Sequence, residues 1–170
     1  MGVLVSFEEG VERLLDAQEV EEICEAVLAA EGIDRPAEVS VSFIGDEQMR
    51  ELNATWRGID APTDVLSFEC DAPDDPGLQP DEVVELGDIM LAPMVITRQA
   101  PGFKTTAVDE CRLMLVHGML HLLGYDHLVE DEALAMEARE LEILRALASE
   151  RGDDPSGVVI GPTTRHEDEG

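Results

Sequence analysis

Three histidines lie within eleven residues, in the segment HGMLHLLGYDH at residues 117–127. Residues four apart on a helix share one face, so the imidazoles of His117 and His121 can point at the same ion. Gly124 permits the positive φ with which a chain leaves a helix and turns back, bringing His127 to that ion. Three imidazoles form a catalytic zinc shell with one position open for water. The spacing therefore predicts one Zn²⁺ per chain, held by these three histidines.

Such an ion can lower the pKa of its bound water to about 7, which makes hydroxide available for hydrolysis at neutral pH. In zinc peptidases the residue after the first histidine is a glutamate that takes a proton from this water. This chain has Gly118 there, and Glu110 is two helical turns from His117. We therefore expect a hydrolytic site that differs from a peptidase site, with space beside the ion for a larger substrate.

Other side chains could support such a site. Asp126, next to His127, could orient an imidazole from behind or cap the turn, and Asp88 could orient a ligand or lie at a strand edge. We expect Trp56 and Phe68 in the core rather than as platforms for stacking nucleobases.

The surrounding sequence alternates between strand and helix patterns without a strict βαβ order. Strands are predicted at residues 3–7, 39–44, 64–70 and 86–91. Helices are predicted at residues 8–30, 47–56 (capped by Asp46), 107–124 and 131–149, with a short one after Pro93. The predicted fold is α+β, a single four-stranded mixed sheet packed with helices. The zinc site would lie on the long central helix and the turn after it.

The chain is long enough for one metallohydrolase-like domain at residues 1–150. The polar, glycine-rich residues 151–170 are predicted to be a disordered acidic tail. The three cysteines, Cys24, Cys70 and Cys111, are widely spaced, which predicts reduced, buried thiols in a cytoplasmic protein. Neither a signal peptide nor an apolar run of about 18 residues occurs, so no membrane association is expected.

The charge is strongly acidic, with 39 acidic residues against 11 basic ones and a net charge of −28. Affinity for RNA rests on neutralised phosphates, so this charge counts against an RNA partner. Seven acids fall in residues 69–85, which we expect to form an exposed, mobile loop away from the site. Arg57, Arg98, Lys104 and Arg112 could gather as a basic patch near the metal. We therefore expect weak binding to free RNA and recruitment through a partner.

Four segments occur in order along the chain: LNATWRGIDAPTDVLSF (52–68), LGDIMLAP (86–93), HGMLHLLGYDH (117–127) and MEARELEIL (136–144). Together they resemble the conserved blocks of the YbeY endoribonucleases, the bacterial rRNA maturation factors. The resemblance covers most of residues 39–145.

The resemblance implies that His117, His121 and His127 hold zinc and that Arg57 is a functionally essential arginine. It implies metal-dependent cleavage of single-stranded RNA, in the maturation of 16S rRNA ends and in ribosome quality control. It also implies work with the small ribosomal subunit and its proteins, and with the Era GTPase.

These residues suit phosphodiester chemistry, with Arg57 and His117 as the catalytic residues. A guanidinium can bind two non-bridging phosphate oxygens at once, while zinc-activated water or a ribose 2′-hydroxyl attacks the phosphorus. Two alternatives stay open. The missing glutamate favours a non-catalytic, zinc-binding ribosome assembly factor, and the histidine spacing alone would also fit a metallopeptidase without its usual base.

Overall fold

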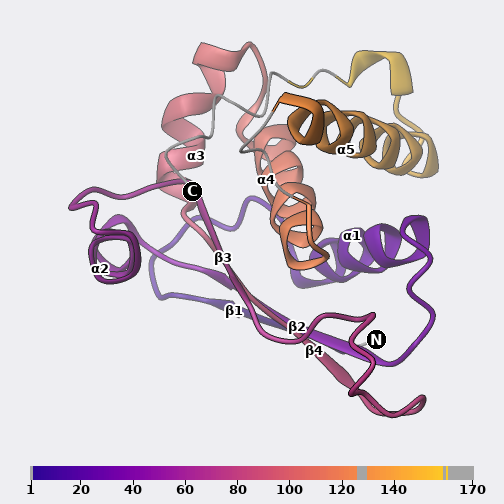
Figure 1. The fold of residues 1–170 in the computed structure, drawn as a ribbon. Coiled ribbons are helices and arrows are strands. Elements are labelled where there is room, and N and C mark those ends of the chain that lie inside the picture. Colours follow the sequence, from indigo (N-terminus) through magenta and orange to yellow (C-terminus); the bar gives the residue numbers. More distant parts are fainter. Residues whose placement is uncertain (1, 126–129, 159, 161–170) are drawn as a thin grey trace.

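The computed structural model describes residues 2–125, 130–158 and 160. Its sheet has the strand order β1–β2–β4–β3 (Figure 1). The strands are β1 Gly2–Phe7, β2 Ala37–Phe43, β3 Val65–Glu69 and β4 Val84–Leu91. β1, β2 and β4 pair in parallel, and β3 pairs antiparallel with β4 at one edge. The predicted α+β class with a mixed four-stranded sheet is thus confirmed.

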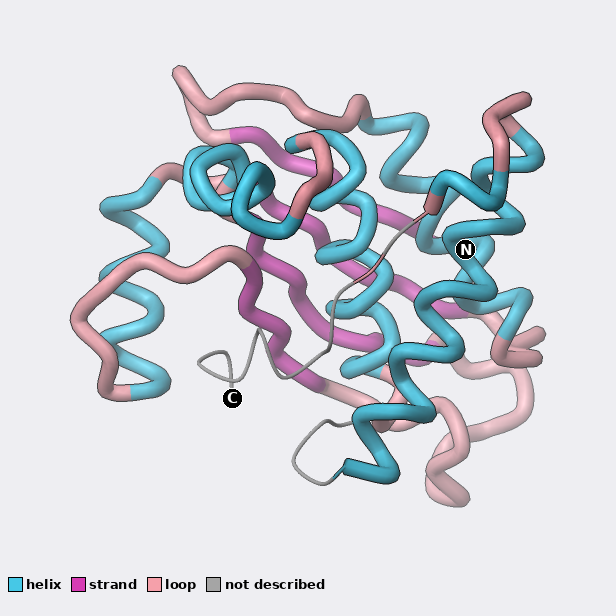
Figure 2. The backbone as a smooth tube through the Cα atoms, turned by 90° about the horizontal axis from the view of Figure 1, so that it is seen from above, coloured by secondary structure: helices cyan, strands magenta, loops and turns pink. Residues whose placement is uncertain are grey.

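Four helices lie on one side of the sheet, as both backbone views show (Figures 1 and 2). They are α1 Ala17–Ala30, α3 Pro93–Gln99, α4 Ala107–Leu122 and α5 Glu130–Glu150. α4 packs on β3 and β4 and also contacts α1, α3 and α5. Two short 3₁₀ helices follow α3 and α5, at Ala100–Phe103 and Pro155–Gly157. Among the described residues, no helix is long and apolar enough to span a bilayer.

The core lies between the sheet and these helices. Along β2, Val39, Val41 and Phe43 are buried, whereas the residues between them point to the other face. Almost every residue of α4 from Leu113 to Leu122 is buried, because the helix is covered on all sides. α2 Asp46–Arg57 packs at the other face of the sheet, over a smaller core formed by Ile44, Met49, Leu66 and Ala92.

The helix predicted at residues 8–30 begins only at Ala17, so its first half was wrong. Asp16 is the N-cap, and its carboxylate accepts a hydrogen bond from the backbone N–H of Glu19 at 2.8 Å. Val11 and Leu14 pack against the core from irregular backbone. Their helical spacing therefore reflected burial rather than helix.

The other helix ends agree closely with the sequence. Thr106 caps α4 by accepting from the backbone N–H of Asp109 at 3.1 Å. Gly58, in the left-handed region at φ 72°, ends α2. Gly45 rather than Asp46 is the N-cap of α2, and Asp46 instead forms an ion pair with Arg98 at 2.8 Å.

The acidic loop between β3 and β4 is exposed, as predicted, and Arg35 holds its backbone. The guanidinium donates to the carbonyl oxygens of Pro73, Gln79 and Glu82 at 3.4, 2.7 and 2.8 Å. After the second 3₁₀ helix, the side chains of Val158 and Ile160 pack against the main core.

The cysteines do not all fit the expected pattern. Cys24 and Cys111 are buried, but Cys70 is exposed at the end of β3, so the prediction of burial was wrong for this thiol. Burial raises the pKa of Cys24 to about 12 and also raises the pKa of Cys111.

Candidate metal centre on helix α4

α4 brings His117 and His121 together as their spacing predicted. Their ring centroids are 4.7 Å apart and the rings are inclined at 80°. His117 is fully buried and His121 is half-buried. Gly124, at φ +102°, follows the end of the helix, and its backbone N–H donates to the carbonyl of His121 at 3.0 Å. His127, like the candidate Asp126, lies outside the described residues, and the roles of both stay predictions.

A carboxylate that sequence analysis missed lies behind His117. Oε2 of Glu140, on α5, is 2.8 Å from Nδ1 of His117, and Glu140 is only 2% exposed. A signal was present in the sequence: Glu140 shares the buried face of α5 with Met136, Ile143 and Leu144. A charged residue on an apolar helix face usually has a partner.

The donor set fits a borderline metal such as zinc. Because Nδ1 of His117 contacts Glu140, Nε2 is the ring nitrogen that would bind the ion. Zinc-binding histidines commonly pair their other ring nitrogen with a carboxylate in this way. Within the described ranges, no group of three His, Cys, Asp or Glu side chains is placed to hold a metal.

Gly118 faces the sheet and does not open onto free space, contrary to our expectation of room for a larger substrate. A Cβ atom there would lie 3.1 Å from both Ile89 Cγ2 and Ser67 Oγ. The residue thus faces β3 and β4, and its lack of a side chain lets α4 approach the sheet closely. A longer side chain at this position would point into the core between α4 and the sheet.

The turn after α4 is tied to the end of α1, which α5 also contacts. The Tyr125 hydroxyl donates to Glu31 Oε1 at 2.6 Å, and Arg139 of α5 donates to Glu31 Oε2 at 2.7 Å and to the Ala30 carbonyl at 2.7 Å. Burial, together with the hydrogen bond to Glu31, raises the pKa of Tyr125. These contacts fix the backbone two residues before His127.

Arg57 is the last residue of α2 and is half-buried. The loop that follows is braced by Asn53, whose side-chain amide donates to the Ala61 carbonyl at 2.7 Å. This loop leads into β3, where Ser67 lies against Gly118 of α4. Arg57 is therefore followed, after one short loop, by the strand that contacts the histidine helix.

Asp88 is exposed on β4, and the structure does not bring it to the two described histidines. Its neighbour Ile89 contacts α4 at Gly118. Because adjacent strand residues point to opposite faces, Asp88 faces away from α4.

A buried polar cluster also escaped sequence analysis. The Gln99 side-chain amide donates to Asp64 Oδ2 at 2.7 Å and to Glu110 Oε2 at 2.9 Å. Both carboxylates are buried. The cluster ties the start of β3 to α3 and to the first turn of α4.

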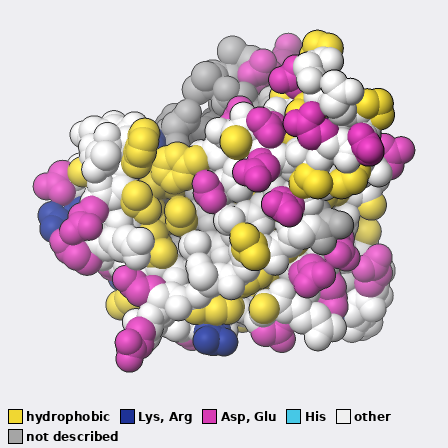
Figure 3. All heavy atoms as spheres, turned by 90° about the horizontal axis from the view of Figure 1, so that it is seen from below, with side chains coloured by type: hydrophobic (Ala, Val, Ile, Leu, Met, Phe, Trp, Pro, Cys, Tyr) yellow, Lys and Arg dark blue, Asp and Glu magenta, His cyan; other side chains and the backbone are white. Residues whose placement is uncertain are grey.

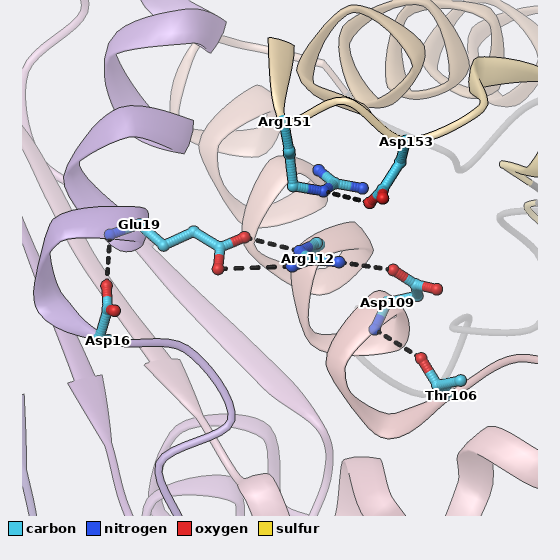
Figure 4. Close-up of polar contacts among 7 residues, drawn as sticks. All are labelled: Asp16, Glu19, Thr106, Asp109, Arg112, Arg151 and Asp153. Carbon is cyan, nitrogen blue, oxygen red and sulfur yellow. Dashed lines mark hydrogen bonds and ion pairs between the residues drawn. The ribbon is translucent and has the colours of Figure 1, made fainter. Parts of the chain in front are cut away.

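Two members of the expected basic patch form ion pairs with carboxylates, which offset their charge. Arg112 is held between Glu19 at 2.6 Å and Asp109 at 2.8 Å (Figure 4). Arg98 pairs with Asp46. Spacing along the sequence could not predict Glu19 as a partner of Arg112, since Glu19 comes from α1.

Trp56 was wrongly predicted to lie in the core. It is 66% exposed and meets Phe68 edge-on, with ring centroids 5.8 Å apart. Phe68 is partly buried against the smaller core.

Acidic side chains lie closer to the histidine helix than we expected. Glu69, Asp71 and Asp74 line a cavity of about 400 Å³ whose wall includes Leu122 and Gly124 at the end of α4. The sheet face opposite the helices also shows many Asp and Glu and few Lys and Arg side chains (Figure 3). The acidic charge is thus not confined to segments remote from the site.

A sequence model of the family described as Endoribonuclease YbeY matches residues 8–148. Relatives with this name include a protein of Allorhizobium ampelinum, 46% identical over 123 residues, or 71% of this chain and 72% of the relative. Another, from Chloroflexus aurantiacus, is 40% identical over 149 residues, or 86% and 96% of the two chains.

A solved structure has the same fold. The solution structure of TM1509 from Thermotoga maritima matches with a TM-score of 0.62 and 25% identity, over 94% of this chain and 98% of that one. The match to the family model includes the histidine helix, the Arg57 loop and Glu140 of α5. The chain therefore belongs to the YbeY endoribonuclease family.

Proposed function

We propose that this protein is a metal-dependent endoribonuclease that cuts single-stranded RNA, acting in 16S rRNA end maturation and ribosome quality control. The observation that carries the proposal is the His117–His121 pair backed by the buried Glu140, in a chain whose relatives are named endoribonucleases. A buried carboxylate on a histidine that shares a helix face with a second histidine is typical of a metal centre.

In this proposal His117, His121 and His127 hold one Zn²⁺. When bound, the ion supplies Lewis acidity that activates water or a ribose 2′-hydroxyl near neutral pH. His117 is held by Glu140, and the ring of His121 lies one helical turn further along α4. The protein's part is to present imidazole nitrogens in a fixed arrangement beside the bound RNA.

Arg57 is proposed to bind the non-bridging oxygens of the scissile phosphate. Its guanidinium is permanently charged and suits the charge that grows on these oxygens in the transition state. Attack by water leaves a 5′-phosphate and a 3′-hydroxyl, whereas attack by the 2′-hydroxyl leaves a 2′,3′-cyclic phosphate. Sequencing the cut ends distinguishes the two routes.

We further propose that the small ribosomal subunit, its proteins and the Era GTPase bring this cytoplasmic enzyme to its RNA. The support is electrostatic: a net charge of −28 and acids beside α4 disfavour tight binding to free RNA.

The test is incubation of untagged, zinc-loaded protein with single-stranded RNA, with and without chelator. We expect cleavage that chelator abolishes, and that His121→Ala and Arg57→Ala each reduce at least about a hundredfold. Arg145→Ala, at an exposed position on α5, is the control and should cleave normally.

Other outcomes would contradict the proposal. Arg57→Ala protein that supports rRNA maturation normally would point to the non-catalytic assembly factor. Cleavage of casein that is lost in His121→Ala would point to a peptidase.

A further inference from the structure

We propose that Glu140 is the positioning residue of the metal centre: it accepts a hydrogen bond from the Nδ1–H of His117 and so directs Nε2 of this ring to the metal. The inference rests on the proposed metal site and adds a residue on a different helix from the two described ligands. Glu140 would act through His117 and would not touch RNA or the metal.

The geometry supports this role. Oε2 of Glu140 lies 2.8 Å from Nδ1 of His117, within the range of a charge-assisted hydrogen bond. The side chains of His117 and Glu140 are only 1% and 2% exposed. Water therefore does not compete for the contact, and the apolar neighbours of Glu140 on α5, Met136 and Ile143, are themselves buried.

The contact decides which nitrogen can bind a metal. A neutral imidazole has one N–H donor and one acceptor nitrogen, and the partner of the donor selects the tautomer. A carboxylate at Nδ1 selects the Nδ1–H form, which leaves the lone pair on Nε2. Loss of such a partner typically weakens metal affinity by about 10- to 100-fold.

A purely structural role makes a different prediction. If the pair only joined α4 to α5, replacing Glu140 would change stability and leave zinc affinity unchanged. Glu140→Gln keeps the shape of the side chain, but its amide can donate to Nδ1 and so favour the wrong tautomer. Glu142→Gln removes the same charge from an exposed position on the same helix and is the matched control.

The first experiment measures zinc affinity of the full chain by competition with a chromophoric chelator, with folding checked by circular dichroism. We expect Glu140→Gln to bind Zn²⁺ about 10- to 100-fold more weakly than wild type and Glu142→Gln to stay within about twofold. If both variants bind like wild type while His121→Ala loses zinc, the role of Glu140 is refuted and the metal site stands. If wild type and His121→Ala bind zinc equally, the proposed metal site fails.

A second measurement uses only the wild-type protein, so it tests the proposal even if Glu140→Gln does not fold. Long-range ¹H–¹⁵N spectra of the wild-type protein, metal-free and zinc-loaded, report which nitrogen of His117 carries a proton. We expect a protonated Nδ1 in both states and zinc on Nε2. An unprotonated Nδ1, or zinc bound to Nδ1, would overturn the proposal.

Discussion

At the scale of single residues, Gly118 determines how closely the histidine helix approaches the sheet. Gly118 is also the residue that departs from the peptidase pattern. A Cβ atom at this position would lie 3.1 Å from side-chain atoms of Ile89 and Ser67. Its cost to the helix, about 1 kcal/mol relative to alanine, is offset by the close packing of α4 on β3 and β4.

We predict that Gly118→Leu lowers the free energy of unfolding by about 2 kcal/mol or more, because the added carbons have no space against the sheet. Urea denaturation measures the change. Gly102→Leu is the matched control, since a Cβ at Gly102 meets nothing within 4 Å, and it should stay within about 0.5 kcal/mol. Equal effects of the two substitutions would refute this explanation of Gly118.

A second residue-scale prediction concerns Cys24. Burial raises the pKa of this thiol from 9.0 to about 12. The folded state therefore holds the thiol proton more tightly than the unfolded state. This contribution to stability is complete below pH 9 and is lost as the pH rises toward 12. Denaturation across this range should show a fall in stability that is smaller in Cys24→Ala than in the exposed Cys70→Ala. An identical pH dependence in both variants would contradict it.

At the scale of elements, three helices meet behind the histidines. Arg139 of α5 donates to Glu31 and Ala30 at the end of α1, and Tyr125, just after α4, donates to the same Glu31. The Arg139 bonds tie α5 to the end of α1, and the His117–Glu140 contact ties α5 to α4.

We predict that Arg139→Ala destabilises the fold by about 2 kcal/mol, because it leaves Glu31, whose side chain is only 11% exposed, without its ion pair. Arg145→Ala removes the same charge from an exposed position on the same helix and should change stability by no more than about 0.5 kcal/mol. Thermal unfolding of both variants is the measurement, and a smaller effect of Arg139→Ala than of Arg145→Ala would contradict the prediction.

Local sequence patterns predicted most of the helices and strands. They could not predict side-chain contacts between elements that are distant in the sequence. Helix geometry alone predicts that His117 and His121, four residues apart, share one face and that the helix ends near Gly124. Glu140 comes from another helix, 23 residues further on, so no short pattern contains it. Arg112 likewise finds Glu19 across 93 residues.

At the scale of the whole molecule, the charge opposes the proposed substrate. The net charge is −28, and Glu69 and Asp74 line the cavity at the end of α4. Phosphates that approach this end of the helix would meet like charge, which salt screens.

We predict that Glu69→Gln combined with Asp74→Asn tightens binding to a single-stranded oligoribonucleotide roughly threefold at low salt. The gain should shrink at high salt, where exposed charges are screened. Glu12→Gln with Glu150→Gln makes the same charge change at exposed positions outside that cavity and should have a smaller effect. Equal gains from both pairs would show that only total charge matters.

The helix carrying His117 and His121 is proposed to hold a metal ion, and the decisive measurement is elemental analysis of untagged protein. We predict about one zinc per chain in the wild type, as three-histidine sites hold a single ion, and almost none in His121→Ala. Wild-type protein without a bound transition metal, or a His121→Ala variant with the same zinc content, would contradict the claim.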